Sequence, residues 1–244
     1  MVATPLQPAY LLHSRPYREN SAILEFFTPD QGRIAMVARG VRGKKSALQP
    51  LLQLYRPLLI SWRGRGPLYS LQDVEPDGPM LHLSGVCLIC GFYINELLVR
   101  LLHHEEAHPA LYATYQLVLQ QMAQNCESND LEWLLRQFEL RLLTELGYGL
   151  NLQSEVEHGE PLQAEQRYCF VLEKGALPWR EGYSVGVPLH GATLLGLAQG
   201  ELNGRRSRNE AKRLMRALLS SLLGHKPLHS RELLQQAIQA PLND

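Results

Sequence analysis

Cysteine is scarce in this sequence, with four residues in 244, and no long hydrophobic run is free of polar side chains. Four cysteines are too few for the disulfide framework of a small secreted protein. The longest mostly apolar stretch, residues 81–99, contains Asn95 and Glu96, which argues against a membrane span. The first twenty residues lack the apolar core and the small-residue cleavage site of a secretory signal. These absences predict a cytoplasmic protein with reduced thiols and no membrane segment.

Acidic residues are absent from residues 31–72, although the whole chain has 24 basic and 24 acidic side chains. This first basic block carries a net charge of +8, and a second block, residues 205–231, carries +7, so the rest of the chain carries −15. Blocks of one sign create strong local fields even where the total charge is zero. The candidate nucleic-acid contacts are Arg33, Arg39, Arg42, Lys44, Lys45, Arg63 and Arg65 in the first block, and Lys212, Arg213, Arg216, Lys226 and Arg231 in the second.

The first 78 residues read as five short strands separated by turn signals. The segments are residues 9–13, 21–28, 33–39, 54–62 and 67–74. Residues 33–39 alternate in character, and Pro29, Asp30 and Gly32 mark a turn before them. Five strands in so short a segment predict a small barrel, for which the five-stranded oligonucleotide-binding (OB) barrel is a model.

Helical periodicity begins near residue 79 and continues to the end of the chain. The expected helices are residues 83–102, 109–124, 131–146, 191–198, 207–223 and 230–238. Ser207 and Glu210 form an S-x-x-E capping box that predicts the start of the fifth helix. Residues 150–188 are irregular, with one strand-like segment at 168–172. The sequence therefore predicts an α+β fold: an OB-type barrel over residues 1–78, then a mainly helical domain over 79–244 with a small β insert.

The loop of residues 39–45 is the most informative segment for binding. It has four cations and two glycines, and glycine lets the backbone approach a ligand closely. Tyr55, Trp62 and Tyr69 lie on neighbouring strand-like segments, where bases can stack on aromatic rings. The three aromatics can equally belong to the barrel core, which is the slightly favoured interpretation.

Motifs for catalysis and metal binding are weak. His104 and His108 match the H-E-x-x-H zinc pattern, but Pro109 disfavours a helical conformation at His108, so an acidic turn between helices is the favoured interpretation. Cys87 and Cys90 form a C-x-x-C on an apolar helix face, where cysteines usually pack as small hydrophobes. Neither G-x-S-x-G nor G-x-G-x-x-G occurs. We expect no catalytic residue, metal or cofactor.

A peptide site is a further possibility on the helix expected at 131–146. Its apolar stripe includes Phe138 and is flanked by Arg136 and Arg141. An apolar groove beside arginine suits a short peptide with an acidic, apolar end. The alternative is an ordinary amphipathic helix with solvated arginines.

Several segments, taken together and in order, resemble the bacterial RecO recombination mediator family. They are residues 11–16 (LLHSRP), Arg39-Gly40 with its basic tail, 91–98 (GFYINELL), 138–149 (FELRLLTELGYG) and 226–233 (KPLHSREL). The resemblance implies an OB barrel followed by a helical domain, binding of single- and double-stranded DNA, annealing of complementary strands, and help in loading RecA onto DNA coated by single-strand-binding protein. It implies a nucleoid-associated location and RecR as a partner, with RecF in some species.

The resemblance also bears on metal and peptide binding. Many family members carry a four-cysteine zinc site after the Leu-Gly-Tyr segment, whereas residues 150–188 here contain Cys169 alone, which indicates a zinc-less remnant. The family implies recruitment by the acidic C-terminal tail of single-strand-binding protein, for which Arg136 is the first candidate anchor and Arg141 the second. The alternatives left open are an RNA-binding barrel protein of the translation machinery and a zinc hydrolase built on His104 and His108.

Overall fold

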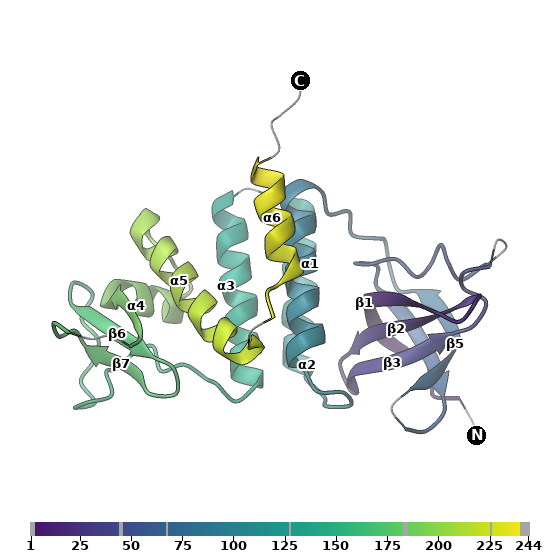
Figure 1. Ribbon diagram of the computed structural model, residues 1–244, viewed down its shortest axis with the longest axis horizontal. Helices are drawn as coiled ribbons and strands as arrows, with labels where there is room; N and C mark the ends of the chain where they lie inside the picture. The colour runs from purple at the N-terminus through teal and green to yellow at the C-terminus, as the bar shows by residue number, and fades with distance from the viewer. Residues whose placement is uncertain are drawn as a thin grey trace. The chain divides into compact units, whose positions relative to one another are not determined.

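The computed structural model describes residues 3–43, 46–66, 68–126, 128–182, 185–224 and 226–239 (Figure 1). The chain divides into two units, Met1–Cys126 with Leu228–Asp244 and Glu127–Pro227. The last barrel strand ends at Pro76 and the first helix begins at Gly85, on either side of the boundary expected after residue 78. The contacts nevertheless group three helices with the barrel, so the first unit is discontinuous in sequence.

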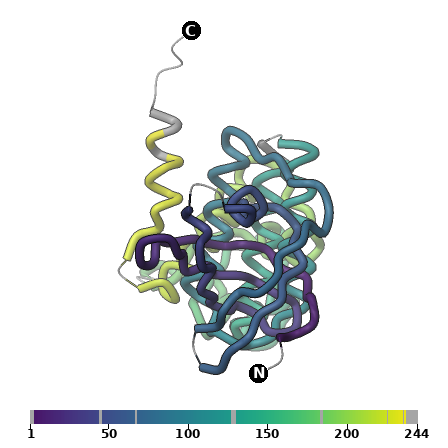
Figure 2. The backbone as a smooth tube through the Cα atoms, turned by 90° about the vertical axis from the view of Figure 1, so that its right-hand side faces the viewer, coloured from purple at the N-terminus to yellow at the C-terminus, as the bar shows by residue number. Residues whose placement is uncertain are grey.

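Five strands form the predicted barrel in the first unit. They are β1 (Gln7–Tyr17), β2 (Ser21–Thr28), β3 (Gly32–Ala38), β4 (Leu58–Arg63) and β5 (Tyr69–Pro76), and they close in the order β1-β2-β3-β5-β4. The β3–β5 pair is parallel and the other pairs are antiparallel. In Figure 2 these strands, purple to blue, face the viewer. The OB-type fold class predicted from the strand spacing is confirmed.

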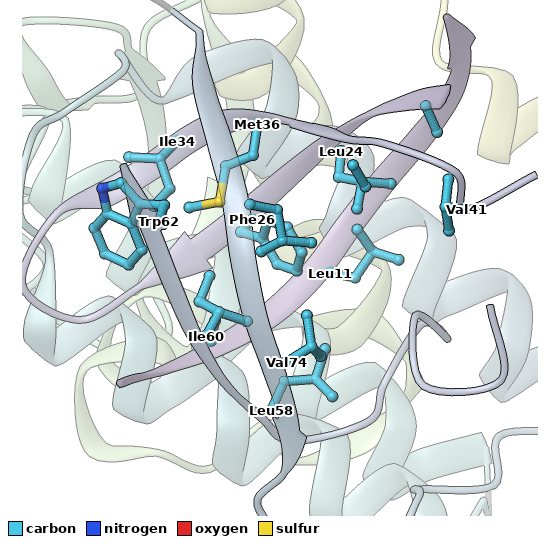
Figure 3. Close-up of a cluster of buried hydrophobic side chains, with 14 residues drawn as sticks. Leu11, Leu24, Phe26, Ile34, Met36, Val41, Leu58, Ile60, Trp62 and Val74 are labelled. Carbon is cyan, nitrogen blue, oxygen red and sulfur yellow. The ribbon is translucent and has the colours of Figure 1, made fainter. Parts of the chain in front are cut away.

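The barrel interior is filled by alternate residues of its strands. Figure 3 shows Phe26 of β2 at the centre of this cluster, between Met36 of β3 and Ile60 of β4, with Leu24 and Leu11 on one side and Ile34 and Trp62 on the other. Tyr55 and Trp62 are also buried, at 3% and 5% exposure, so both belong to the core and not to a stacking surface. Tyr69 is partly buried against the same cluster.

Two helices, α1 (Gly85–Leu101) and α2 (Pro109–Gln124), pack against β1 and β2 through an aromatic cluster. Tyr115 of α2 meets the edges of Tyr10 and Phe27, with ring centroids 5.3 and 5.9 Å apart. Tyr112 completes the cluster on the same helix. Burial raises the pKa of Tyr10 to about 12 and that of Tyr115 well above its ordinary value, so both phenols stay neutral in the folded protein.

Asn95 of α1 supplies the polar contact within this apolar packing. Its Nδ2 donates to the carbonyl oxygen of Leu12 at 3.1 Å, and its Oδ1 accepts from the Tyr115 hydroxyl at 2.7 Å. The register of β1 against β2 shifts between Leu11 and His13, so Leu12 lies at a bulge, outside the regular ladder. Asn95 therefore links one strand and two helices.

The last helix, α6 (His229–Gln239), belongs to the first unit and packs on α1 (Figure 1). The Glu96 carboxylate accepts from the backbone N–H groups of His229 (2.9 Å) and Ser230 (3.0 Å) and from the Ser230 hydroxyl (2.7 Å). Burial alone would raise the pKa of Glu96, but these hydrogen bonds outweigh it and hold the pKa below its ordinary value. Glu96 thus caps α6 from another helix.

The loop after α1 packs on the barrel at Gly32. Gly32 has φ of +61°, and a Cβ there would overlap the carbonyl oxygen of Glu106. The Glu105 N–H donates to the carbonyl of Arg33 at 3.0 Å, and the Tyr69 hydroxyl donates to the Glu105 carboxylate at 2.8 Å. Glycine is required here by both backbone conformation and the close approach of the loop.

The second unit combines three helices with a small sheet. Its elements are α3 (Ser128–Glu145), β6 (Arg167–Val171), β7 (Gly175–Pro178), β8 (Val187–His190), α4 (Gly191–Gln199) and α5 (Gly204–Leu223). The sheet order is β7-β6-β8. Only one strand was predicted in this region, because β7 and β8 have only four residues each and contain glycine or proline.

The predicted capping box of the fifth helix is wrong. Helix α5 begins at Gly204, after Asn203, so Ser207 lies inside it. The Glu210 carboxylate instead accepts from the His190 N–H (3.0 Å) and the Thr193 hydroxyl (2.6 Å), at the start of α4. The Glu210 side chain thus binds the start of α4 and not, as the local spacing predicted, the backbone at the start of α5.

The prediction that all thiols are reduced is also contradicted. Cys87, in the first turns of α1, forms a disulfide with Cys126, which follows α2. Cys90 and Cys169 take no part in a disulfide and are buried, so the packed-hydrophobe interpretation holds for Cys90 but not for Cys87. The two bonded cysteines are 39 positions apart, and only the packing of α1 and α2 brings them together.

We expect Gly32→Ala to lower the free energy of unfolding by about 2–4 kcal/mol, because it adds both backbone strain and overlap with Glu106. Gly40→Ala is the matched control: Gly40 has φ of +69°, but its Cβ would meet nothing within 4 Å. Urea unfolding of the two variants measures the difference. Equal losses would show that the loop does not press on the barrel at Gly32.

We expect the docking of α6 to weaken in acid. Since the pKa of Glu96 is lowered in the folded protein, its stabilising contribution is complete well above the ordinary value of 4.5 and is lost as pH falls below it. Melting curves of wild type and Glu96→Gln between pH 7 and pH 3 should converge at the acidic end. Glu75→Gln, at an exposed position, should keep a constant offset instead.

Candidate nucleic-acid interface

The loop after β3 lies against the turn between β1 and β2. The backbone N–H of Arg42 donates to the carbonyl of Asn20 at 3.1 Å, and its guanidinium reaches the carbonyl of Arg18 at 3.5 Å. In the β2–β3 ladder Ala22 pairs with Ala38, so Arg39 emerges at the same end of the barrel. Arg18, Arg39 and Arg42 are all exposed, and we call these three the hairpin cluster.

An aromatic ring accompanies the hairpin cluster. The Arg18 guanidinium lies over the ring of Tyr17, 5.2 Å from its centroid, and Arg18 has φ of +52°. Neither residue was among the predicted contacts, because both precede the acid-free block that begins at residue 31. The available signal was the β1–β2 hairpin, whose turn brings residues 17–20 beside the end of β3.

The other cations of the first block do not join this cluster. Lys44 and Lys45 lie outside the described residues. Arg63 and Arg65 are exposed at the turn between β4 and β5. Since β5 begins at Tyr69, beside Met36, and runs parallel to β3, the turn before Tyr69 lies toward the Gly32 end of β3. The structure thus places the candidate contacts of the block at two ends of the strands.

Arg33 is already engaged by acidic and histidine side chains. Its guanidinium lies 3.7 Å from the Glu25 carboxylate and 3.3 Å from His104 Nδ1, with a side-chain exposure of 13%. Burial lowers the pKa of Arg33, and Glu25 acts in the opposite direction. These contacts give Arg33 a structural role in joining β3 to the loop after α1.

The cations of helix α5 lie on two different faces of the helix. Arg208 and Lys212 lie 3.8 and 3.6 Å from the Glu132 carboxylate of α3. Arg206, Arg213 and Arg216 are exposed, and their spacing of seven and three places them on one face of the helix. We call these three arginines the helix cluster. Arg213 also donates to the carbonyl of Pro188 at 3.3 Å.

The remaining candidates of the second block separate from the helix cluster. Lys226 is exposed beyond the end of α5, in the second unit. Arg231 is partly buried on α6, which belongs to the first unit. The block that is continuous in sequence is therefore divided between two units.

The candidate peptide residues on α3 differ in accessibility. Phe138 is fully buried, and Arg136, with 8% side-chain exposure, pairs with the Glu139 carboxylate at 2.6 Å. Arg141 is 38% exposed and pairs with Glu145 at 2.8 Å. Arg136 in this geometry binds a carboxylate of its own helix, so Arg141 is the more accessible of the two proposed anchors.

The H-E-x-x-H motif lies in the loop between α1 and α2, as the acidic-turn interpretation predicts. His104 Nε2 lies 3.1 Å from Glu25, and His108 is buried immediately before α2. Within the described residues, no group of three or more His, Cys, Asp or Glu side chains is arranged to hold a metal ion.

A carboxylate organises the irregular segment before β6. Glu155 accepts from the backbone N–H groups of Glu157 (2.6 Å), His158 (2.7 Å) and Glu160 (3.1 Å). Burial would raise the pKa of Glu155, but these hydrogen bonds lower it. Cys169 is buried in β6, with its Sγ 3.1 Å from the carbonyl of Val185.

Comparison with known proteins gives one family for both parts of the chain. The family model "Recombination protein O N terminal" matches residues 2–79, and "Recombination protein O C terminal" matches residues 83–232. "DNA repair protein RecO" of Nitrosospira multiformis is 45% identical over 231 residues, covering 94% of each chain. The protein of the same name from Nitrosococcus oceani is 46% identical over 231 residues (95% of this chain, 93% of the relative). That of Coxiella burnetii strain RSA 493 is 44% identical over 229 residues (94% and 97%).

We expect the hairpin cluster to contribute to the salt dependence of DNA binding. Each lost phosphate contact should reduce the slope of log K against log salt by about 0.7 for a single strand. Replacing Arg39 and Arg42 together by Ala should thus lower the slope by about 1.4 in anisotropy titrations of labelled oligo-dT. Arg33→Ala, whose charge is compensated by Glu25, should leave the slope unchanged.

We expect Arg136→Ala to lower the free energy of unfolding by about 3 kcal/mol, because it breaks a buried ion pair. Arg141→Ala breaks a more exposed pair and should cost less than about 1 kcal/mol. Guanidinium unfolding measures both. Similar stabilities for the two variants would show that the Arg136–Glu139 pair is not buried in solution.

Proposed function

The chain belongs to the RecO family of DNA repair proteins, and we propose that it acts there as a non-catalytic mediator that anneals complementary single strands of DNA. In this role it binds single- and double-stranded DNA and helps to load RecA onto strands coated by single-strand-binding protein. Its proposed partners are RecR, with RecF in some species, and the C-terminal tail of single-strand-binding protein.

The observation that carries this proposal is the presence of two exposed sets of cations on separate units. The hairpin cluster lies on the barrel of the first unit, and the helix cluster lies on α5 of the second. Annealing brings two polyanions together, and their repulsion must be neutralised before bases can pair. One cluster for each strand meets this requirement without any covalent chemistry.

The barrel supports binding to single strands in particular. OB barrels hold single-stranded nucleic acid in a basic groove with aromatic side chains beneath the bases. Here Tyr17 lies beside the hairpin cluster, while Tyr55 and Trp62 are core residues. Tyr17 is therefore the aromatic ring that we propose for stacking. The names of the relatives favour DNA over RNA as the polyanion.

Recruitment by the tail of single-strand-binding protein is proposed to use Arg141 as the cation for the terminal carboxylate. Arg141 is accessible, whereas Arg136 is held by Glu139. An arginine pairs with a carboxylate through two parallel hydrogen bonds, which suits a chain terminus. Binding of a labelled tail peptide to Arg141→Ala tests this assignment, with the exposed Arg180→Ala as control.

The helix cluster should matter more for annealing than for binding one strand. Reversing Arg213 and Arg216 to Glu should slow annealing by at least about tenfold, since it removes the second neutralising surface and adds repulsion. Affinity for a short single strand should fall less than about threefold, because the barrel is unchanged. The assay follows fluorescence transfer between complementary oligonucleotides precoated with single-strand-binding protein.

Lys212→Glu is the matched control for this variant. Lys212 lies on the same helix but next to Glu132, so its charge is already compensated. Its reversal should affect annealing less than reversal of Arg213 and Arg216. Equal loss of annealing and of single-strand affinity in the Arg213/Arg216 variant would indicate one continuous site and contradict the two-surface proposal.

A further inference from the structure

The Cys87–Cys126 disulfide lies away from both cation clusters in the sequence, and its two halves differ in accessibility. Cys87 is 1% exposed within the first turns of α1, whereas Cys126 is exposed at the end of the first unit. A thiolate from solvent can therefore reach Cys126, while Cys87 is shielded by its helix. Attack at an accessible sulfur is what thiol–disulfide exchange requires.

The bond is unexpected for a protein that repairs DNA. DNA repair takes place beside the chromosome, and in bacteria that compartment is kept reducing by small thiols and dithiol proteins. Disulfides in such compartments are usually transient and serve redox sensing or catalysis. An exposed disulfide is more labile than a buried one under these conditions. The bond is therefore better explained as reversible than as a permanent cross-link.

We propose that Cys87 and Cys126 form a reversible thiol–disulfide exchange site whose co-substrate is a dithiol protein of the thioredoxin class. A thiolate of the dithiol attacks Cys126 Sγ, the bond to Cys87 breaks, and Cys87 leaves as a thiolate that takes up a proton. The second thiol of the co-substrate then attacks the mixed disulfide and releases Cys126 as a thiol. Two electrons pass to this chain, and the co-substrate leaves as a disulfide.

The position of Cys126 gives the exchange a mechanical consequence. Helix α2 ends at Gln124, α3 begins at Ser128, and Cys126 is the last residue of the first unit. The oxidised bond fixes the chain to α1 at the point where it leaves this unit. In the reduced state the end of α2 loses its covalent tie to α1, so its last turn frays more readily. Fraying lengthens the connection between the units.

Only the effect of this longer connection on reactions with DNA rests on the proposed function. A longer connection bears on a reaction that uses one cation cluster from each unit. The exchange chemistry itself is independent of DNA. The experiments below use no DNA, so their failure would contradict the exchange site and leave the annealing proposal standing.

The first test follows the bond in the full-length protein. After oxidation with glutathione disulfide, peptide mapping should show Cys87 joined to Cys126. After native treatment with thioredoxin and its reductase, Cys126 should be alkylated in the native protein and Cys87, which is 1% exposed, only after denaturation. Cys90 and Cys169, which are buried, should remain unlabelled in native protein. Absence of the linked peptide after oxidation, or its persistence after thioredoxin, would overturn the proposal.

The second test measures what the bond does. Oxidised wild type should melt on the order of 10 °C above the reduced form, as expected for closure of a loop with a 39-residue separation. Hydrogen exchange in residues 121–126 should be faster after reduction. Both differences should vanish in Cys126→Ser, which changes an exposed position, and persist in the matched control Cys90→Ala. Identical melting and exchange in the two redox states of wild type would contradict the mechanical role.

Discussion

The side-chain amide of Asn95 joins a β-bulge of the barrel to two helices, and the packing of the first unit depends on that pair of hydrogen bonds. The bulge frees the Leu12 carbonyl from the ladder, and Asn95 donates to it while accepting from Tyr115. A buried amide costs about 1–3 kcal/mol for each group left unsatisfied. This placement of α1 and α2 satisfies both ends of the amide, so the amide favours it over placements that would bury similar apolar area but leave one end unpaired.

Local signals predict much of the fold, and contacts between distant segments explain where they fail. Strand β2 and helix α2 have the predicted bounds, since a turn precedes β3 and Pro109 sets the first turn of α2. Glu210 lies in the predicted helix, but its carboxylate was assigned to the wrong helix start, because its partners His190 and Thr193 are 17 to 20 residues away. The Cys87–Cys126 bond was missed for the same reason, since spacing along the chain does not reveal which helix ends meet.

The basic segments of the candidate site were predictable from the sequence, but which of their cations lie exposed on the surface was not. The acid-free segment singles out Arg39 and Arg42, and both are exposed at one end of the barrel. The sequence could not show that Glu25 neutralises Arg33, that Glu132 lies beside Lys212, or that Arg136 is buried with Glu139. Acidic partners lie on other segments for Arg33 and Lys212 and on the same helix for Arg136, and they separate the cations with a structural role from those exposed for binding. Arg18 joins the available group because the β1–β2 turn places it there.

The capping of α6 by Glu96 has a consequence for biosynthesis. Glu96 and Ser230 are 134 residues apart, and the second unit lies between them in the chain. At a synthesis rate of about 5–20 residues per second, the ribosome needs on the order of ten seconds to deliver α6 after α1 has emerged. The second unit is synthesised during that interval, while the first unit waits for its last helix. The unit that is begun first is therefore completed last, and a chain released early leaves α1 uncovered where α6 belongs.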